Sequence, residues 1–192
     1  MKNMKKTMLA AALAATLLAP IPAYAENEDG SAANTETTTA SMPNPIVEYT
    51  NVPDLELALG FPVLYLPGSL YATYHPALVI NSIGGTISDL HFRSREDESR
   101  IIVRTALLKT VNTEDISGYY GVNWALQDVG DMKHTQVNVA ITEDGTHVAR
   151  WTKGRFVFSL AIKDMDEKNF RFVLKNYVVC ADRFAYRYRE EA

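Results

Sequence analysis

From residue 77 onward, short runs of β-prone residues recur along the chain, separated by glycines or charged residues. Apolar and polar residues alternate most clearly in residues 137–141 and 156–160, a pattern typical of strands with one buried face. The runs predict strands over residues 77–83, 86–93, 100–110, 122–129, 135–142, 147–151 and 155–162. We therefore predict an antiparallel β-meander sheet of about six to seven strands.

Two segments carry helix signals. Proline near the start and glycine at the end predict a short helix over residues 53–60. Asp164 is the expected N-cap of a longer helix, and Glu167, three residues later, completes a capping box. Apolar residues then recur at spacings of three and four and form one stripe, which consists of Phe170, Val173, Leu174, Tyr177, Val178 and Ala181. We expect this C-terminal helix to cover one face of the sheet, which makes the domain α+β.

The turns between the strands predict which residues pair, and these pairs argue against a metal site. If Gly84-Gly85 is a two-residue loop, His91 pairs with Leu78. In the hairpin at residues 144–145, His147 pairs with Thr142 on the same reasoning. In this register no two histidines are neighbours, so we predict neither a metal site nor a cofactor. The chain has four histidines, namely His75, His91, His134 and His147.

The N-terminal 25 residues have the organisation of a secretory signal peptide. Three lysines precede an apolar run over residues 8–18, and Ala23 and Ala25 stand at positions −3 and −1 of a cleavage site. The apolar run has 11 residues, whereas a membrane-spanning helix needs about 18 or more. We predict cleavage after Ala25, no stable membrane span afterwards, and a location in the periplasm, the cell envelope or outside the cell. Retention of the leader as an anchor is the alternative.

Composition divides the remaining chain into three parts. Residues 26–44 contain almost no large apolar side chains, which predicts a flexible, disordered linker. Residues 45–181 hold the predicted strands and helices and make one α+β domain. Residues 182–192 interleave three arginines with three aromatic residues, and we assign them to a C-terminal extension outside the domain.

Charge and cysteine content narrow the class of protein. The leader holds three of the 19 lysines and arginines and none of the 23 acidic residues, so the exported chain carries 16 basic residues against 23 acidic ones, a formal charge of −7. This charge disfavours nucleic acid as a partner. Cys180 is the only cysteine, so no disulfide can form within the chain, and its apolar neighbours predict a buried, unreactive thiol.

The sequence contains no motif for nucleophilic catalysis, neither Gly-x-Ser-x-Gly nor Ser-x-x-Lys. The acidic residues 96–98 follow Arg95 in a charged turn between strands, which is typical of a solvated surface. We predict no catalytic residues and hence an exported non-enzymatic binding or sensing domain. Two alternatives stay open: a hydrolase of envelope polymers that uses dispersed carboxylates, and a carrier of an apolar ligand held beneath the helix.

Residues 118–124, Gly-Tyr-Tyr-Gly-Val-Asn-Trp, place three aromatic residues on a loop that leads into a predicted strand. Aromatic side chains on such loops supply large contact areas at binding surfaces. Tyr119, Tyr120 and Trp124 are therefore our candidate residues for binding a partner, which we expect to be an envelope protein or a cell-surface polymer. The alternative is that Tyr120 and Trp124 close the end of the core.

Two motifs carry a resemblance to a known family. They are LALGFPVLYLPGSL, residues 57–70, and the hairpin VARWTKGRFVFSLAI, residues 148–162. Together with the central meander and the final helix, they resemble the bacterial extracytoplasmic family called domain of unknown function 4367, over about residues 52–178. Members of that family often form the outer portion of membrane-anchored anti-sigma factors. The resemblance implies a sensing or binding module outside the cytoplasm and supplies no catalytic residues. This chain departs from the anti-sigma members, because it shows no sigma-binding helices and its leader fits a cleavage site.

Overall fold

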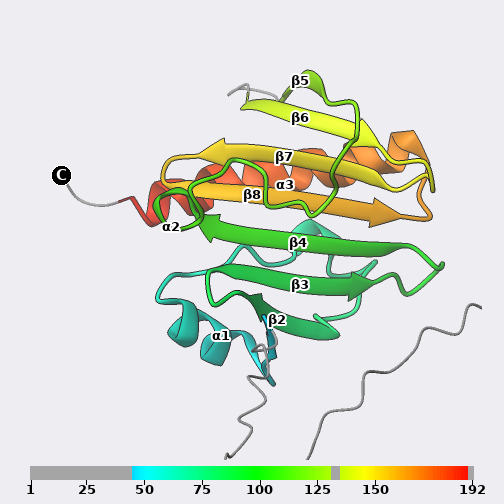
Figure 1. Cartoon of the computed structure of the whole chain (residues 1–192). Coiled ribbons are helices and arrows are strands. Elements are labelled where there is room, and N and C mark those ends of the chain that lie inside the picture. Colours follow the sequence, from blue (N-terminus) through cyan, green and yellow to red (C-terminus); the bar gives the residue numbers. More distant parts are fainter. Residues whose placement is uncertain (1–44, 131–134, 190–192) are drawn as a thin grey trace, which may run out of the picture. The chain divides into compact units, whose positions relative to one another are not determined.

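The computed structural model describes residues 45–130 and 135–189 of the 192-residue chain (Figure 1). Our predictions for the leader, the linker and His134 lie outside the described residues. The strands are β1 Ile46–Glu48, β2 Val79–Ile83, β3 Ile87–Arg93, β4 Arg100–Leu107, β5 Ala125–Val129, β6 Thr135–Ile141, β7 His147–Lys153 and β8 Phe156–Lys163. The helices are α1 Val52–Leu59, α2 Leu108–Val111 and α3 Glu167–Arg187, together with a 3-10 turn at Gly68–Leu70.

These strands form one antiparallel sheet in the order β1-β2-β3-β4-β8-β7-β6-β5. The prediction of an antiparallel sheet with a C-terminal helix, an α+β arrangement, is therefore confirmed. The strand order differs from a single meander, because β4 pairs with β8 and the chain returns to β5 at the far edge. The connection over residues 108–124, which we call the crossing segment, passes over one face of the sheet to reach that edge (Figure 1).

The described sheet has eight strands rather than six or seven. The additional strand is β1, which has only three residues and pairs with β2 from Ile46 opposite Ile83. Three residues are too few for alternation of apolar and polar residues to be recognised, and all three are exposed. Tertiary pairing with β2 therefore creates a strand that the local pattern does not indicate.

One face of the sheet, which we call the helix face, packs against α3 at β7 and β8 and against α1 at β2 and β3. In Figure 1, α3 lies behind β7 and β8. The stripe predicted on α3 is buried throughout, from Phe170, 4% exposed, to Ala181, 0% exposed. It belongs to one core with fully buried residues of the central strands, among them Leu90, Ile101, Val103, Phe156, Phe158, Leu160 and Ile162. The opposite face, which we call the loop face, is crossed by residues 108–124, where Ile116 is buried with Ala106 and Val157.

The longer helix begins two residues later than predicted. Asp166, rather than Asp164, is the N-cap, and its carboxylate accepts a hydrogen bond from the Asn169 amide at 2.9 Å. Asp164 has a φ of 59°, a left-handed conformation that places it in the turn before the helix. Asp164 and Asp166 are both aspartates, which are favoured at the N-cap, so residue type does not distinguish them. The backbone turn after β8 therefore determines which of the two caps the helix.

The same helix continues past residue 181 to Arg187, so much of the segment that we assigned to an extension is helical. Phe184 packs edge-on against Phe156 with ring centroids 4.9 Å apart, and Ala185 is buried. These contacts extend the apolar stripe by another turn. Cys180 is half-buried rather than buried, and burial raises the pKa of its thiol, which nearby Arg183 opposes.

Two predicted hairpin registers are wrong by one residue. His91 pairs with Val79 rather than Leu78, because Ile83 pairs with Ile87 and the loop has one residue more than predicted. His147 pairs with Ile141 rather than Thr142, since the Thr142 amide bonds to the Thr146 carbonyl within a longer turn. Turn length sets the register, and neither turn is as tight as its glycine content predicted.

None of the helices in the described ranges is both long and apolar enough to cross a bilayer.

Candidate functional site

A row of polar residues crosses the middle of the loop face. The pairing of the strands places one residue from each of six strands opposite the next, from β2 to β6. This polar row consists of Asn81, Asp89, Arg104, Ser159, Arg150 and Asn138. Asn81, Asp89 and Ser159 are buried, and the other three are half-buried. Buried polar side chains in a sheet require partners, and the crossing segment supplies several of them.

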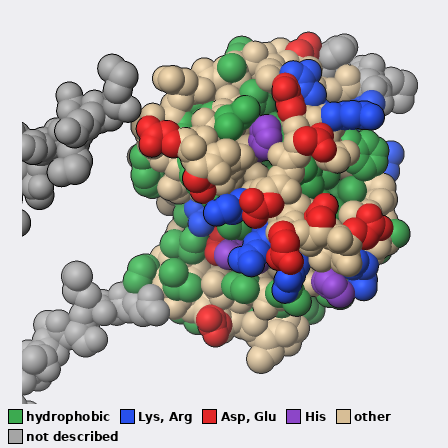
Figure 2. All heavy atoms as spheres, turned by 90° about the vertical axis from the view of Figure 1, so that its right-hand side faces the viewer, with side chains coloured by type: hydrophobic (Ala, Val, Ile, Leu, Met, Phe, Trp, Pro, Cys, Tyr) green, Lys and Arg blue, Asp and Glu red, His purple; other side chains and the backbone are tan. Residues whose placement is uncertain are grey.

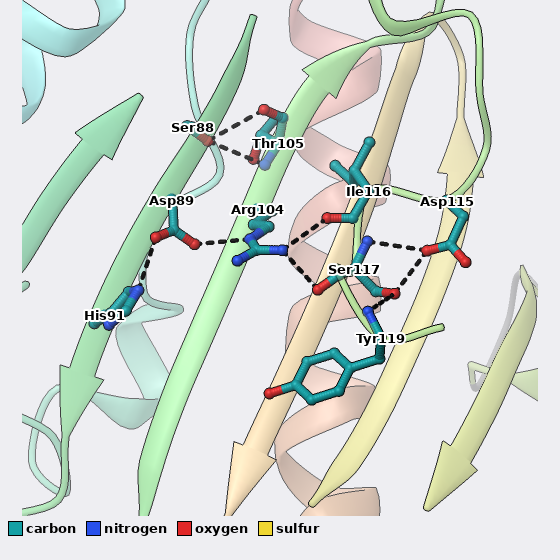
Figure 3. A network of polar contacts seen from close by, with 9 residues as sticks. All are labelled: Ser88, Asp89, His91, Arg104, Thr105, Asp115, Ile116, Ser117 and Tyr119. Carbon is teal, nitrogen blue, oxygen red and sulfur yellow. Dashed lines mark hydrogen bonds and ion pairs between the residues drawn. The ribbon is translucent and has the colours of Figure 1, made fainter. Parts of the chain in front are cut away.

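Asp89 holds the first part of the row together. Its two carboxylate oxygens lie 2.8 Å from Arg104 Nε and 2.8 Å from His91 Nε2 (Figure 3). Burial raises the pKa of Asp89, but the hydrogen bonds from His91 and Arg104 outweigh burial and hold that pKa below its ordinary value. Asp89 is therefore an anion that orients His91 on β3 and Arg104 on β4.

Arg104 connects the sheet to the crossing segment. Its Nη1 donates to the carbonyl oxygens of Ile116, at 3.2 Å, and of Ser117, at 2.6 Å (Figure 3). The next residue is Gly118, with a φ of 77°, where an added Cβ would lie 2.5 Å from Arg104 Nη1. Both this backbone conformation and this close approach favour glycine. A single guanidinium therefore satisfies the loop backbone and the Asp89 carboxylate together.

A second arginine of the polar row, Arg150, holds the crossing segment at another point. Arg150 Nη1 lies 2.6 Å from a carboxylate oxygen of Asp115, and the Arg150 guanidinium lies 4.4 Å from the centre of the Trp124 ring. The Asp115 carboxylate also accepts hydrogen bonds from the Ser117 amide and hydroxyl. Contacts at two arginines thus position the loop that carries the predicted aromatic residues.

Beside the polar row lies a groove of about 470 Å³, which we call the basic groove. Its floor includes Val79, Ile102 and Ala161, and these residues form a row with His91 on adjacent strands. Leu78 is 63% exposed at its edge, and Tyr119 of the crossing segment lines it from above the sheet. The groove therefore combines an apolar floor with an imidazole that Asp89 orients.

Three cations stand at the outer end of the basic groove, where β3 and β8 end and β4 begins. Arg93 is opposite Arg100, and Arg100 is opposite Lys163, so like charges face each other across three strands. Arg93 forms an exposed ion pair with Glu98 at 3.2 Å, and Lys163 lies 3.6 Å from Asp144. Within residues 45–130 and 135–189, Arg100 forms no ion pair. These strand ends lie at the right of Figure 1, and Figure 2 shows basic, acidic and histidine side chains gathered on that side.

The three predicted site residues lie in three different environments. Tyr119 lines the basic groove, and burial raises the pKa of its hydroxyl, with Arg104 opposing. Tyr120 is 83% exposed and points to solvent, so it does not close the core. Trp124 is half-buried beneath the Arg150 guanidinium. The structure therefore brings only Tyr119 to the groove.

Sequence reasoning missed the cations of the groove, because residues 93, 100 and 163 carry no motif. The one available signal is that Arg93 and Arg100 flank the charged turn at residues 94–99. Lys163 reaches them only through the pairing of β4 with β8, which no local pattern indicates.

Three of the described carboxyl groups have a shifted pKa. Wherever the pKa of such a group departs from its ordinary value, it is lowered, as in Asp89, Asp97 and Asp144, the last to about 2 through hydrogen bonds from Thr142 and Thr146. In the same part of the chain, no three histidine, cysteine or acidic side chains gather closely enough to hold a metal ion.

Searches against family models, curated proteins and solved structures find no match to this chain. The resemblance to domain of unknown function 4367 therefore stays a prediction.

Proposed function

We propose that this chain is an exported, non-enzymatic binding domain whose basic groove takes an amphiphilic anion. The observation that carries the proposal is the row of Arg93, Arg100 and Lys163 at one end of an apolar floor. The signal peptide pattern of residues 1–25 supports a role in the periplasm or envelope. The resemblance to an extracytoplasmic sensing family is consistent with the same role.

Repulsion between the three cations favours an anionic group in the ligand. Like charges directly opposite each other on neighbouring strands destabilise a sheet. Arg93 and Lys163 each have an exposed acidic neighbour, which offsets the repulsion only weakly. Arg100 has no ion pair among the described residues. A carboxylate or phosphate between these side chains removes the repulsion and accepts charge-assisted hydrogen bonds.

The apolar floor of the groove favours a hydrocarbon part in the ligand. Val79 and Ile102 are half-buried on the loop face, and Leu78 is largely exposed beside them. The groove volume of about 470 Å³ lies in the range of small-molecule sites, about 300–1,000 Å³. A short hydrocarbon chain on this floor keeps its anionic end at Arg100 and its middle under Tyr119.

The proposal predicts binding of octanoate in preference to octan-1-ol, which lacks the charge, and to acetate, which lacks the chain. Isothermal titration calorimetry with the full chain measures the three affinities. Arg100→Gln should weaken octanoate binding by about tenfold or more, because a hydrogen bond to a charged group is lost. Tyr119→Ala should weaken it by about fivefold, since apolar contact is lost while the sheet is kept.

Lys168→Gln is the matched control, because it removes one positive charge from an exposed position of α3, away from the groove. It should leave octanoate affinity unchanged. Equal binding of octanol and octanoate, or full octanoate affinity in Arg100→Gln, would show that the cationic row is not an anion site.

A further inference from the structure

The side of α3 that points away from the sheet combines exposed aromatic residues with cations. Phe172 is 58% exposed and Tyr186 is 67% exposed, and half-buried Val179 lies midway between them. A spacing of seven residues places the three on one side of a helix. The outer helix face consists of Lys168, Phe172, Lys175, Val179, Arg183, Tyr186 and Arg187.

This face is positively charged, although the chain as a whole has a formal charge of −4. It holds four cations and no carboxylate among the residues of α3, all of which the structure describes. The two acidic residues of α3 lie to the sides, where Glu167 pairs with Arg171 at 2.6 Å and Asp182 pairs with Lys153 at 2.8 Å. The positive charge is therefore concentrated on the outer side of the helix.

A further aromatic residue extends the surface next to the second half of α3. Tyr71 is 56% exposed and lines a hollow together with Arg183 and Arg187. The turn that precedes it is held to the helix by a hydrogen bond of 2.6 Å from the Ser69 hydroxyl to the Asn176 side chain. Aromatic and basic side chains thus alternate over a surface that the rest of the described fold does not cover.

We propose that the outer helix face docks on an anionic phospholipid bilayer, with α3 lying in the plane of the interface. Such interfacial helices carry aromatic and aliphatic residues flanked by lysine and arginine. The lysines and arginines attract lipid phosphates, and the tyrosines and Phe172 occupy the boundary between headgroups and acyl chains. At 21 residues, α3 is about 31 Å long, so it places several cations on the surface at once.

A bilayer fits this face better than a soluble polyanion. A polyanion in water contacts the cations alone and leaves Phe172 and Tyr186 in water. The bilayer interface accommodates both kinds of side chain, because its headgroups are charged and its acyl chains are apolar. The proposal is independent of the basic groove, which lies on the other face of the sheet.

The test measures sedimentation of the full chain with vesicles of phosphatidylglycerol and phosphatidylcholine, and with vesicles of phosphatidylcholine alone. Binding should require the anionic lipid and fall as salt is raised. Arg183→Gln and Arg187→Gln should each lower the partition coefficient by about fivefold. Phe172→Ala should lower it by a similar factor, and Arg100→Gln is the matched control that should leave it unchanged.

A local readout separates α3 from the apolar leader. Tryptophan emission of a Tyr186→Trp variant should shift to shorter wavelength with anionic vesicles, because the indole enters the interface. Sedimentation without this shift, or equal binding of neutral vesicles, would overturn the proposal. So would a soluble dextran sulfate that binds as tightly as the vesicles and is unaffected by Phe172→Ala. Octanoate binding reports on the groove alone, so failure of either proposal is distinguishable from failure of the other.

Discussion

Among the single residues, Arg104 is the one that connects the loop face of the sheet to the crossing segment. Its guanidinium bonds to the Asp89 carboxylate and to two backbone carbonyls of the crossing segment. The side chain of Arg104 is 20% exposed and that of Asp89 is 7% exposed, so water competes weakly for these hydrogen bonds. Loss of the Asp89 carboxylate leaves the largely buried Arg104 guanidinium without its countercharge, which is more costly than loss of a surface ion pair.

Asp89→Asn should therefore lower the free energy of unfolding by about 3 kcal/mol at pH 7, at the lower end of the range for buried pairs. The pKa of Asp89 is lowered in the folded chain, so its contribution to stability is present above the ordinary carboxyl pKa, about 4, and is lost as the pH falls through the folded value. Denaturant unfolding between pH 7 and pH 2 measures this effect. The free energy of unfolding should fall less with decreasing pH in the variant than in the parent.

Glu114→Gln is the control for this experiment, because Glu114 is an exposed carboxyl group on the same crossing segment. It should change the free energy of unfolding by no more than about 0.5 kcal/mol. An Asp89→Asn variant as stable as the parent at pH 7 would contradict the role assigned to the pair.

Among the helices and strands, α3 has one side buried against the sheet and one side exposed. Leu174 is 1% exposed against the sheet, whereas Phe172, two residues earlier, is 58% exposed. The buried side supplies much of the core, and the outer side is available for contact with other molecules. The crossing segment is the opposite kind of element, since side chains of the sheet rather than its own backbone pattern hold it in place.

Leu174→Ala should lower the free energy of unfolding by about 2 to 5 kcal/mol, because it removes buried methylene groups and leaves a cavity. Phe172→Ala, on the same helix, should change it by no more than about 0.5 kcal/mol. Thermal and denaturant unfolding of the two variants measure the difference. Equal effects would mean that the helix does not bury the side that the structure assigns to the core.

At the scale of the whole molecule, the helix face and the loop face of one sheet carry different surfaces. The loop face holds the basic groove, and α3 on the helix face turns its cations outward. An exported chain with both surfaces can bind an amphiphilic anion while it lies at an anionic bilayer. This combination follows from the two proposals and depends on export.

We predict that the exported chain begins at Glu26, because Ala23 and Ala25 satisfy the small-residue requirement of a cleavage site. Intact mass and N-terminal sequencing of the protein recovered outside the cytoplasm measure this. An Ala25→Leu variant should be processed poorly, whereas Ala33→Leu in the predicted linker should be processed normally. Recovery of chains that retain residues 1–25 in a membrane fraction would support the anchor alternative instead.

Most elements could be predicted from the sequence because their signals are local. The alternation in residues 137–141 and 156–160 lies within β6 and β8, and the stripe from Phe170 to Ala181 is the buried side of α3. Errors arose where two local signals were equivalent, as for the N-caps Asp164 and Asp166, or where the signal was too short, as for β1. The predicted aromatic loop includes Tyr119, which lines the basic groove. Tyr120 does not lie in the groove with it, because no neighbouring residue buries the Tyr120 side chain.

By itself, the sequence determined the fold class, most of the strands and the buried stripe of α3, since periodicity and capping act over a few neighbouring residues. Only the tertiary structure decided that β4 pairs with β8, and with it the meeting of Arg93, Arg100 and Lys163. Strand order and register depend on which strands bury the most apolar surface when they pack together in the whole domain. The free energy of that burial cannot be predicted from the residues of any single segment.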